Sequence, residues 1–210
     1  WKLTIEDIKT AGVDLTKGTE VVVIYNAHLN EKAQVNHASG STTNKNTVSL
    51  EYSNNPNVEG LGKTPEDTVW VFTYEVDNTK YQNALPADGG IALADAGFRL
   101  YQNGQEVSLI YDTTLSAYRP TKGNETAEEM KSAADGKFNI VGLDAGTYTL
   151  KETTTPTGFN TCEDITITIS ANHTENADGA SATTTLTAES TMTNNIVNKS
   201  GSTLPETGGM

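Results

Sequence analysis

The sequence predicts an all-β protein made of antiparallel Ig-like β-sandwich domains in tandem, and three observations support this prediction. Apolar and polar residues alternate with a period of two, the pattern of strands that bury one face. Clusters of Gly, Asn and Asp separate these segments, as expected where short strands are joined by tight turns. Helical periodicity is scarce, and its best candidate is a short surface turn at residues 126–134. Short strands at such regular spacing are typical of Ig-like sandwiches.

The expected strands share a high content of Val, Ile, Thr and Tyr, which suit a pleated and half-buried surface. In chain order they span residues 19–25, 47–52, 69–76, 97–101, 137–141, 147–152, 165–169 and 183–187. The turns expected between them lie at residues 16–18, 87–90, 102–104, 134–136 and 143–146.

A domain boundary is expected near residues 54–72, where Asn, Gly and Pro make the sequence resemble a linker. Residues 1–66 hold too few strands for a sandwich, so we expect the C-terminal part of a preceding domain plus a linker. They could alternatively add strands to the second domain, residues 67–200. Residues 201–210 form a polar tail that is expected to be flexible. Since neither a starting Met nor a signal peptide is present, the chain is expected to be a fragment.

The tail carries the string LPETG, the peptide that a sortase cuts between Thr and Gly to attach a protein to a cell wall. Its residues are Leu204, Pro205, Glu206, Thr207 and Gly208. A transpeptidase needs an extended and accessible segment, and a polar tail after a folded domain provides one. The string therefore predicts an extracellular protein anchored to a Gram-positive cell wall.

Composition excludes several other classes of function. A net charge of −13 and a pI near 4.5 argue against a nucleic-acid partner, whose phosphates would be repelled. A single cysteine, Cys162, rules out an intramolecular disulfide and is expected to act as a small apolar residue. The histidines His28, His37 and His173 lack metal-ligand spacing, and no catalytic triad or phosphate-binding loop stands out. We expect no metal, no cofactor and no turnover enzyme.

Three polar residues lie in phase with the apolar face of an expected strand. Counting by twos from Tyr74 leads to Lys80, Tyr148 leads to Glu152, and Ile196 leads to Asn198. Burial would favour a neutral, nucleophilic amine and a protonated carboxyl group. Glu152 could then donate a hydrogen bond to the side-chain carbonyl of Asn198 and shuttle protons while a Lys–Asn isopeptide bond forms. On strand phase alone, charged groups reaching solvent at strand ends remain the favoured reading.

Motifs along residues 70–208 shift that balance, because they resemble the Cna protein B-type domains of Gram-positive pilins. The resembling segments are YTLKET and PTGF at 148–153 and 156–159 (an E-box), LADAGFRLY at 93–101, FNIVGLDAGTY at 138–148, and IVNKSG at 196–201. The resemblance implies an intramolecular isopeptide bond between Lys80 and Asn198 that Glu152 promotes. It also makes Asn54 a weaker candidate, whose lysine partner would precede Trp1. Asn194 and Asn195 are rival acceptors for Lys80.

The resemblance implies a structural subunit of a wall-anchored pilus or surface shaft. Its partners would be a sortase and, through covalent bonds, other pilin subunits or peptidoglycan. The alternative is a wall-anchored adhesin that binds a host matrix protein or glycan through the loop region 102–134, which contains Arg119.

Overall fold

The computed structural model describes residues 2–6, 12, 20, 22–27, 29, 33, 44–53, 60–170, 173–176, 183–186 and 192–201. The chain divides into two compact units, Trp1–Lys32 and Ala33–Met210. The boundary predicted near residue 66 stays a prediction. In the described part of the chain, no helix has the length and apolar character needed to cross a membrane.

The strand predicted at residues 19–25 is wrong for its described part. Residues 22–27 form no strand, and Val22 and Ile24 are 66% and 87% exposed. A strand is stable only with a hydrogen-bonded neighbouring strand, and residues 22–27 belong to none of the sheets that the described residues form. High β propensity alone therefore does not produce a strand here.

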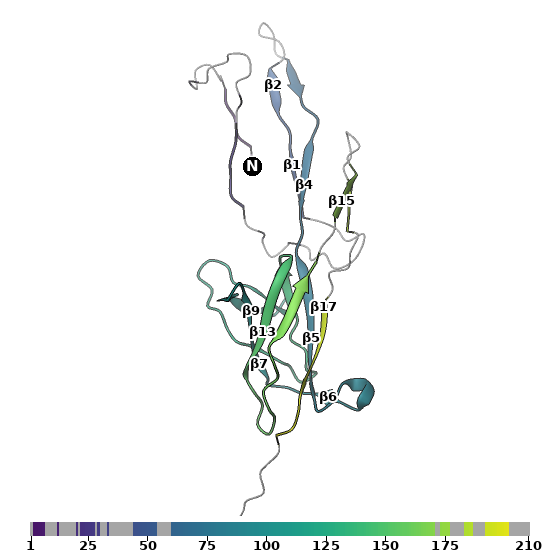
Figure 1. The fold of residues 1–210 in the computed structure, drawn as a ribbon. Helices are drawn as coiled ribbons and strands as arrows, with labels where there is room; N and C mark the ends of the chain where they lie inside the picture. The colour runs from purple at the N-terminus through teal and green to yellow at the C-terminus, as the bar shows by residue number, and fades with distance from the viewer. Residues whose placement is uncertain are drawn as a thin grey trace, which may run out of the picture. The chain divides into compact units, whose positions relative to one another are not determined.

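An antiparallel ribbon opens the described part of the second unit (Figure 1). β1 (Asn44–Val48) pairs with β4 (Asp67–Val71), and β2 (Glu51–Ser53) pairs with β3 (Leu61–Lys63). Between the two pairs, the Thr64 N–H donates to the Leu50 carbonyl at 2.9 Å. The predicted strand 47–52 is thus divided between β1 and β2.

Two sheets follow the ribbon and face each other across one core. The six-stranded sheet has the order β17 (Met192–Asn198), β5 (Tyr74–Gln82), β12 (Ile140–Leu143), β10 (Ala117–Pro120), β9 (Leu109–Asp112), with β6 (Ile91–Ala92) also paired to β5. The five-stranded sheet has the order β11 (Met130–Lys131), β7 (Gly97–Gln102), β13 (Gly146–Thr154), β14 (Ile165–Ile169), with β8 (Gln105–Glu106) also paired to β7. A 3-10 turn, η1 (Pro86–Asp88), precedes β6, and β15 (His173–Asn176) pairs with β16 (Thr183–Leu186).

The core between the sheets confirms the predicted all-β sandwich. Alternate residues of β5, β7, β13 and β14 point inward, as the period of two required. The buried apolar side chains that pack together are Tyr74, Val76, Ala96, Phe98, Leu100, Leu109, Tyr118, Met130, Phe138, Ile140, Leu143, Tyr148, Leu150, Ile167, Ile169 and Ile196.

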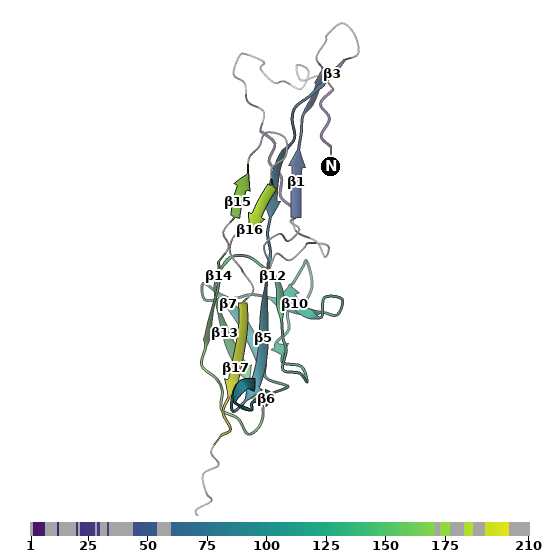
Figure 2. The ribbon, with the colours of Figure 1, turned by 90° about the vertical axis from the view of Figure 1, so that its right-hand side faces the viewer.

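Strand direction differs from the antiparallel expectation in two places. β17 runs parallel to β5, and β10 runs parallel to β12. Figure 2 shows β17, the edge strand of this sheet, beside β5. The first and last long strands of the sandwich are therefore direct neighbours, although residues 83–191 separate them in the sequence. This pairing brings the chain segments that carry Lys80 and Asn198 together.

The helix predicted at residues 126–134 is wrong, since this segment contains β11. Its backbone bonds lead to other strands: the Glu128 N–H donates to the Leu109 carbonyl at 2.8 Å, and Met130 pairs with Phe98. Met130 is 1% exposed, and this burial against the core replaces the local hydrogen bonds of a helix.

Candidate isopeptide site

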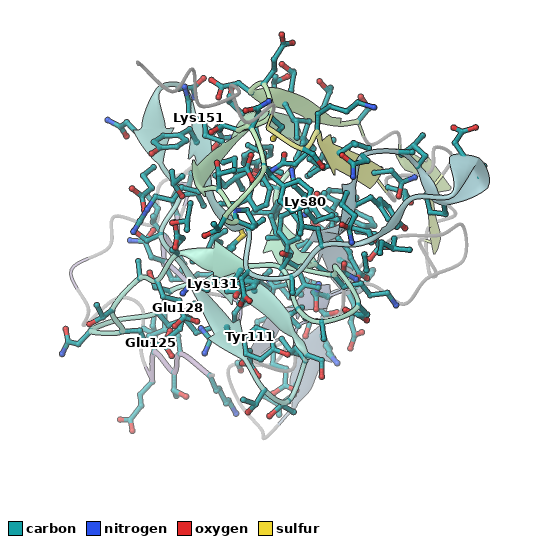
Figure 3. All side chains as sticks on the ribbon, turned by 90° about the horizontal axis from the view of Figure 1, so that it is seen from below. Lys80, Tyr111, Glu125, Glu128, Lys131 and Lys151 are labelled. Carbon is teal, nitrogen blue, oxygen red and sulfur yellow. The ribbon has the colours of Figure 1, made fainter. Side chains whose placement is uncertain are left out.

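Lys80 lies on the inward face of β5, as strand phase predicted. Its side chain is completely buried, and Figure 3 places it among the packed side chains while Lys151 lies near the rim. The backbone is held on both sides, because the Lys80 N–H donates to the Gly136 carbonyl at 2.8 Å and its carbonyl accepts from Leu93 at 2.9 Å. Gly136 has φ +80°, and a Cβ there would lie 2.4 Å from the Lys80 oxygen, so the close approach requires glycine.

Glu152 and Asn198 enter the same interior from opposite sheets. Glu152 follows Tyr148 and Leu150 on the inward face of β13, and Asn198 follows Ile196 on that of β17. The side chain of Glu152 is fully buried, and Asn198 is 1% exposed. The reading in which these groups reach solvent at strand ends is therefore incompatible with the structure.

The three side chains form a continuous hydrogen-bonded chain. Lys80 Nζ donates to Asn198 Oδ1 at 2.6 Å, and Asn198 Nδ2 donates to Glu152 Oε1 at 2.6 Å. Lys80 Nζ also lies 3.7 Å from Glu152 Oε1. The amine, the carboxamide and the carboxylate thus meet within contact distance, although they come from three strands.

Hydrogen-bond direction differs from the prediction. Glu152 was expected to donate to the Asn198 carbonyl, but it accepts from the Asn198 amide nitrogen, while Lys80 donates to the carbonyl. The bond to Lys80 polarises the carbonyl carbon, and the bond to Glu152 places beside the nitrogen that would leave a carboxyl group that can deliver a proton to it once it has taken one from the amine.

An aromatic ring, supported by a second one, lies over the amine of Lys80. Lys80 Nζ lies 5.1 Å from the centre of the Phe98 ring, and Phe98 stacks on Phe138 with centroids 4.4 Å apart and planes 10° apart. The ring face attracts a cation, yet the same rings exclude water from the amine. Burial lowers the pKa of Lys80, and the nearby Cys162 and Glu152 oppose that shift. A larger neutral fraction makes the amine a better nucleophile.

Cys162 contributes to this site, although strand phase did not reveal it. Its backbone N–H donates to Glu152 Oε2 at 2.7 Å, so the second carboxylate oxygen also has a partner. The partly buried side chain packs against the core, as the sequence predicted for a small apolar residue, and burial raises the pKa of its thiol. A loop backbone donor leaves no pattern in the sequence that would have identified it.

The chain remains anchored for three residues after Asn198. The Asn83 N–H donates to the Asn198 carbonyl at 2.7 Å, and Asn83 Oδ1 accepts from both the N–H and the hydroxyl of Ser200 at 2.8 Å. Lys199 Nζ bonds the Asn83 carbonyl, and the Gly201 N–H donates to the Gly158 carbonyl. These contacts attach the chain that leaves the sandwich to two loops, one at Asn83 and one at Gly158.

The other predicted site residues have different outcomes. Asn54 and the string Leu204, Pro205, Glu206, Thr207 and Gly208 lie outside the described residues. Asn195 is exposed on β17 and does not join the buried triad, whereas Asn194 bonds Asn78. Within the described residues, no group of three His, Cys, Asp or Glu side chains gathers as a metal site.

Arg119, in the loop region considered for ligand binding, is held by two carboxylates. Its Nε donates to Asp112 at 2.8 Å, and its terminal nitrogens donate to Glu125 at 2.7 and 2.9 Å. The bonds from Arg119 and from the Lys122 N–H lower the pKa of Glu125 to about 2. Arg119 thus braces the loop region internally, and this observation does not favour the adhesin alternative.

Comparison with solved structures returns pilins of Gram-positive bacteria. The minor pilin GBS52 of Streptococcus agalactiae is 21% identical over 63% of this chain and 46% of its own, with a TM-score of 0.45. The backbone protein of group B streptococcus pilus 2b is 23% identical over 67% and 48%, with a TM-score of 0.44. The shaft pilin SpaA of Lactobacillus rhamnosus GG is 21% identical over 67% and 52%, with a TM-score of 0.44. The matches thus span about half the length of these pilins.

Comparison with family models and with curated proteins gives one match. No curated protein matches the chain. Residues 83–183 match the model described as SpaA, a prealbumin-like fold domain. That segment includes Glu152 but ends before Asn198 and begins after Lys80. Over residues 83–183 the chain is therefore similar to the SpaA prealbumin-like fold domain, which confirms the resemblance to the domains of Gram-positive pilins.

Proposed function

We propose that this chain is a load-bearing structural segment of a wall-anchored pilus or surface shaft, cross-linked internally by an isopeptide bond between Lys80 and Asn198. The observation that carries the proposal is the buried chain of hydrogen bonds from Lys80 through Asn198 to Glu152. An amine without solvent contact is costly to bury in its charged form, and a reaction that turns it into a neutral amide removes that cost.

The proposed reaction exchanges one amide for another. Lys80 Nζ attacks the Asn198 side-chain carbonyl carbon and forms a C–N bond, while the bond from that carbon to Nδ2 breaks. Glu152 accepts a proton from the attacking nitrogen and delivers one to the departing nitrogen, so that ammonia leaves and Glu152 is regenerated. The reaction consumes no cofactor, and each chain performs it once.

Strand direction supports a mechanical role for this bond. Because β5 and β17 are parallel neighbours, a pull on the start of β5 and on the end of β17 would shear one strand along the other. A covalent bond from Lys80 to Asn198 would carry that load directly and would leave the chain between them, residues 81–197, unloaded. Resistance to force and proteolysis would follow without a reducible disulfide.

The second part of the proposal concerns the tail. A sortase would cleave after Thr207 and join its carboxyl group to a pilin lysine or to peptidoglycan, outside the cell. Support comes from the LPETG string itself and from the anchored exit at Ser200 and Gly201, only a few residues upstream. The tail would then continue the load path that the isopeptide bond begins.

Intact-mass measurement of the folded chain tests the cross-link. We expect one ammonia less than the sequence mass, because bond formation expels the Asn198 amide nitrogen. Lys80→Met and Asn198→Ala should each restore the full mass. An unshifted mass in folded wild-type protein would refute the cross-link.

Incubation with a sortase and a short amine-terminated glycine peptide tests the tail. The expected product ends at Thr207 and carries the peptide, because the transpeptidase exchanges the Thr–Gly bond for a new amide. A Leu204→Ala chain is the matched control and should remain uncut. Equal processing of both chains would contradict specific recognition of LPETG.

A further inference from the structure

A second polar contact links β5 and β17 beside the proposed cross-link. Asn194 Nδ2 donates to Asn78 Oδ1 at 3.0 Å. Asn78 is completely buried, and its own Nδ2 donates to the Phe138 carbonyl at 3.2 Å. The Asn78 N–H donates to Asn139 Oδ1 at 3.2 Å, which fixes the residue from the β12 side as well. Asn78 thus presents an immobile acceptor to one position of β17.

Asn78, which carries this acceptor, is the inward-pointing residue of β5 that comes immediately before Lys80. In the parallel pairing Asn194 stands opposite Asn78, Ile196 opposite Lys80, and Asn198 opposite Gln82. Lys80 therefore reaches diagonally to the next inward residue of β17. The inward carboxamides of β17 are those of Asn194 and Asn198, four residues apart, so the strand carries two chemically equal acceptors.

We propose that Asn78 and Asn194 are positioning residues that fix the register of β17 and so select Asn198, not Asn194, as the acceptor for Lys80. This inference rests on the proposed isopeptide bond and adds what decides its partner. Neither residue exchanges atoms with the reacting groups.

Hydrophobic patterning alone leaves the register of β17 ambiguous. A shift by an odd number of residues would turn Ile196 toward solvent, and the pattern of the strand opposes that. Shifts by two or four residues keep the same face inward. A four-residue shift would bring Asn194 opposite Gln82, into the place of Asn198.

The hydrogen bond from Asn194 to Asn78 favours the observed register over these even shifts. A two-residue shift would set Met192 or Ile196 opposite Asn78, and neither side chain can donate to the buried Oδ1. The four-residue shift would set Ser190 opposite it, and the Ser190 hydroxyl is one bond shorter in reach than the Asn194 amide that spans the 3.0 Å contact. Leaving a buried acceptor without its partner is unfavourable. The observed register satisfies that acceptor and places a carboxamide beside Lys80 at the same time.

Time-resolved mass spectrometry of the full 210-residue chain after cell-free synthesis tests this selection. In Asn78→Leu both acceptors remain while the register contact is lost. We expect cross-linking about tenfold slower and peptide mapping that finds part of the bond on Asn194. Asn194→Leu should be slowed similarly, with a fraction of chains unlinked. Asn195→Leu, one residue away and exposed, should react as wild type.

A destabilised variant that keeps the contact between Asn78 and Asn194 separates the effect of strand register from the effect of lower overall stability. Ile167→Val removes a buried methyl group from β14 and should lower stability without moving the bond from Asn198. Wild-type rate and exclusive use of Asn198 in both Asn78→Leu and Asn194→Leu would overturn the inference while leaving the cross-link intact. A wild-type chain that never loses ammonia would instead refute the proposed function on which the inference rests.

Discussion

Replacing Glu152 with Gln is expected to slow formation of the Lys80–Asn198 bond by about 10²- to 10⁴-fold, the range for loss of a positioned general acid–base. The substitution keeps the volume of the side chain and lets its carbonyl oxygen accept from Asn198 Nδ2, as the carboxylate does at 2.6 Å. A carboxamide cannot take a proton from the amine or deliver one to the leaving nitrogen. Lys80 and Asn198 would therefore stay in contact without reacting.

Ammonia loss followed by intact mass measures this rate. Asp164→Asn provides the matched control, because it makes the same chemical change at an exposed carboxylate that pairs with Lys151 at the surface. The control should react as wild type. Equal rates in Glu152→Gln and in the wild type would show that proximity of Lys80 and Asn198 suffices and that Glu152 transfers no proton.

Strand phase predicted which residues point inward more reliably than local sequence pattern predicted which segments form strands or helices. The inward positions of Lys80, Glu152 and Asn198 follow from counting by twos along well-patterned strands, and all three are buried. The described part of segment 19–25 and the segment 126–134 were predicted wrongly, because β propensity and a helical pattern were judged without knowing the neighbouring strands. Pairing partners decide whether such local preferences are realised.

Parallel pairing was not predictable from the local pattern. Alternation identifies a buried face but carries no information on whether the neighbour runs parallel or antiparallel. The adjacency of β5 and β17 depends on contacts more than a hundred residues apart, such as Asn194 with Asn78. The backbone donor of Cys162 to Glu152 was hidden for a similar reason, since any non-proline residue can supply an N–H.

Chains that lack the cross-link are expected to unfold at a temperature lower by on the order of 15 °C. The bond would close a loop between residues 118 positions apart, and chain-entropy estimates for such loops give about 4 to 5 kcal/mol. Two unlinked variants, Glu152→Gln and Lys80→Met, should both show this loss in thermal unfolding. Similar unfolding temperatures in all three chains would contradict a stabilising bond.

The pH dependence of the two variants should differ, because only Glu152→Gln keeps the Lys80 amine. Burial lowers the pKa of that amine in the folded state from its ordinary value of 10.5. Between the lowered value and 10.5 the unfolded chain binds more protons than the folded one, so the free energy of unfolding rises with pH across that window. Lys80→Met and the linked wild type have no free amine at this position and should lack this rise. Parallel pH profiles in the two variants would show that the buried amine does not titrate as proposed. A rise confined to Glu152→Gln would instead identify the neutral amine of Lys80 as the form that the interior stabilises, which is the form that a nucleophilic attack requires.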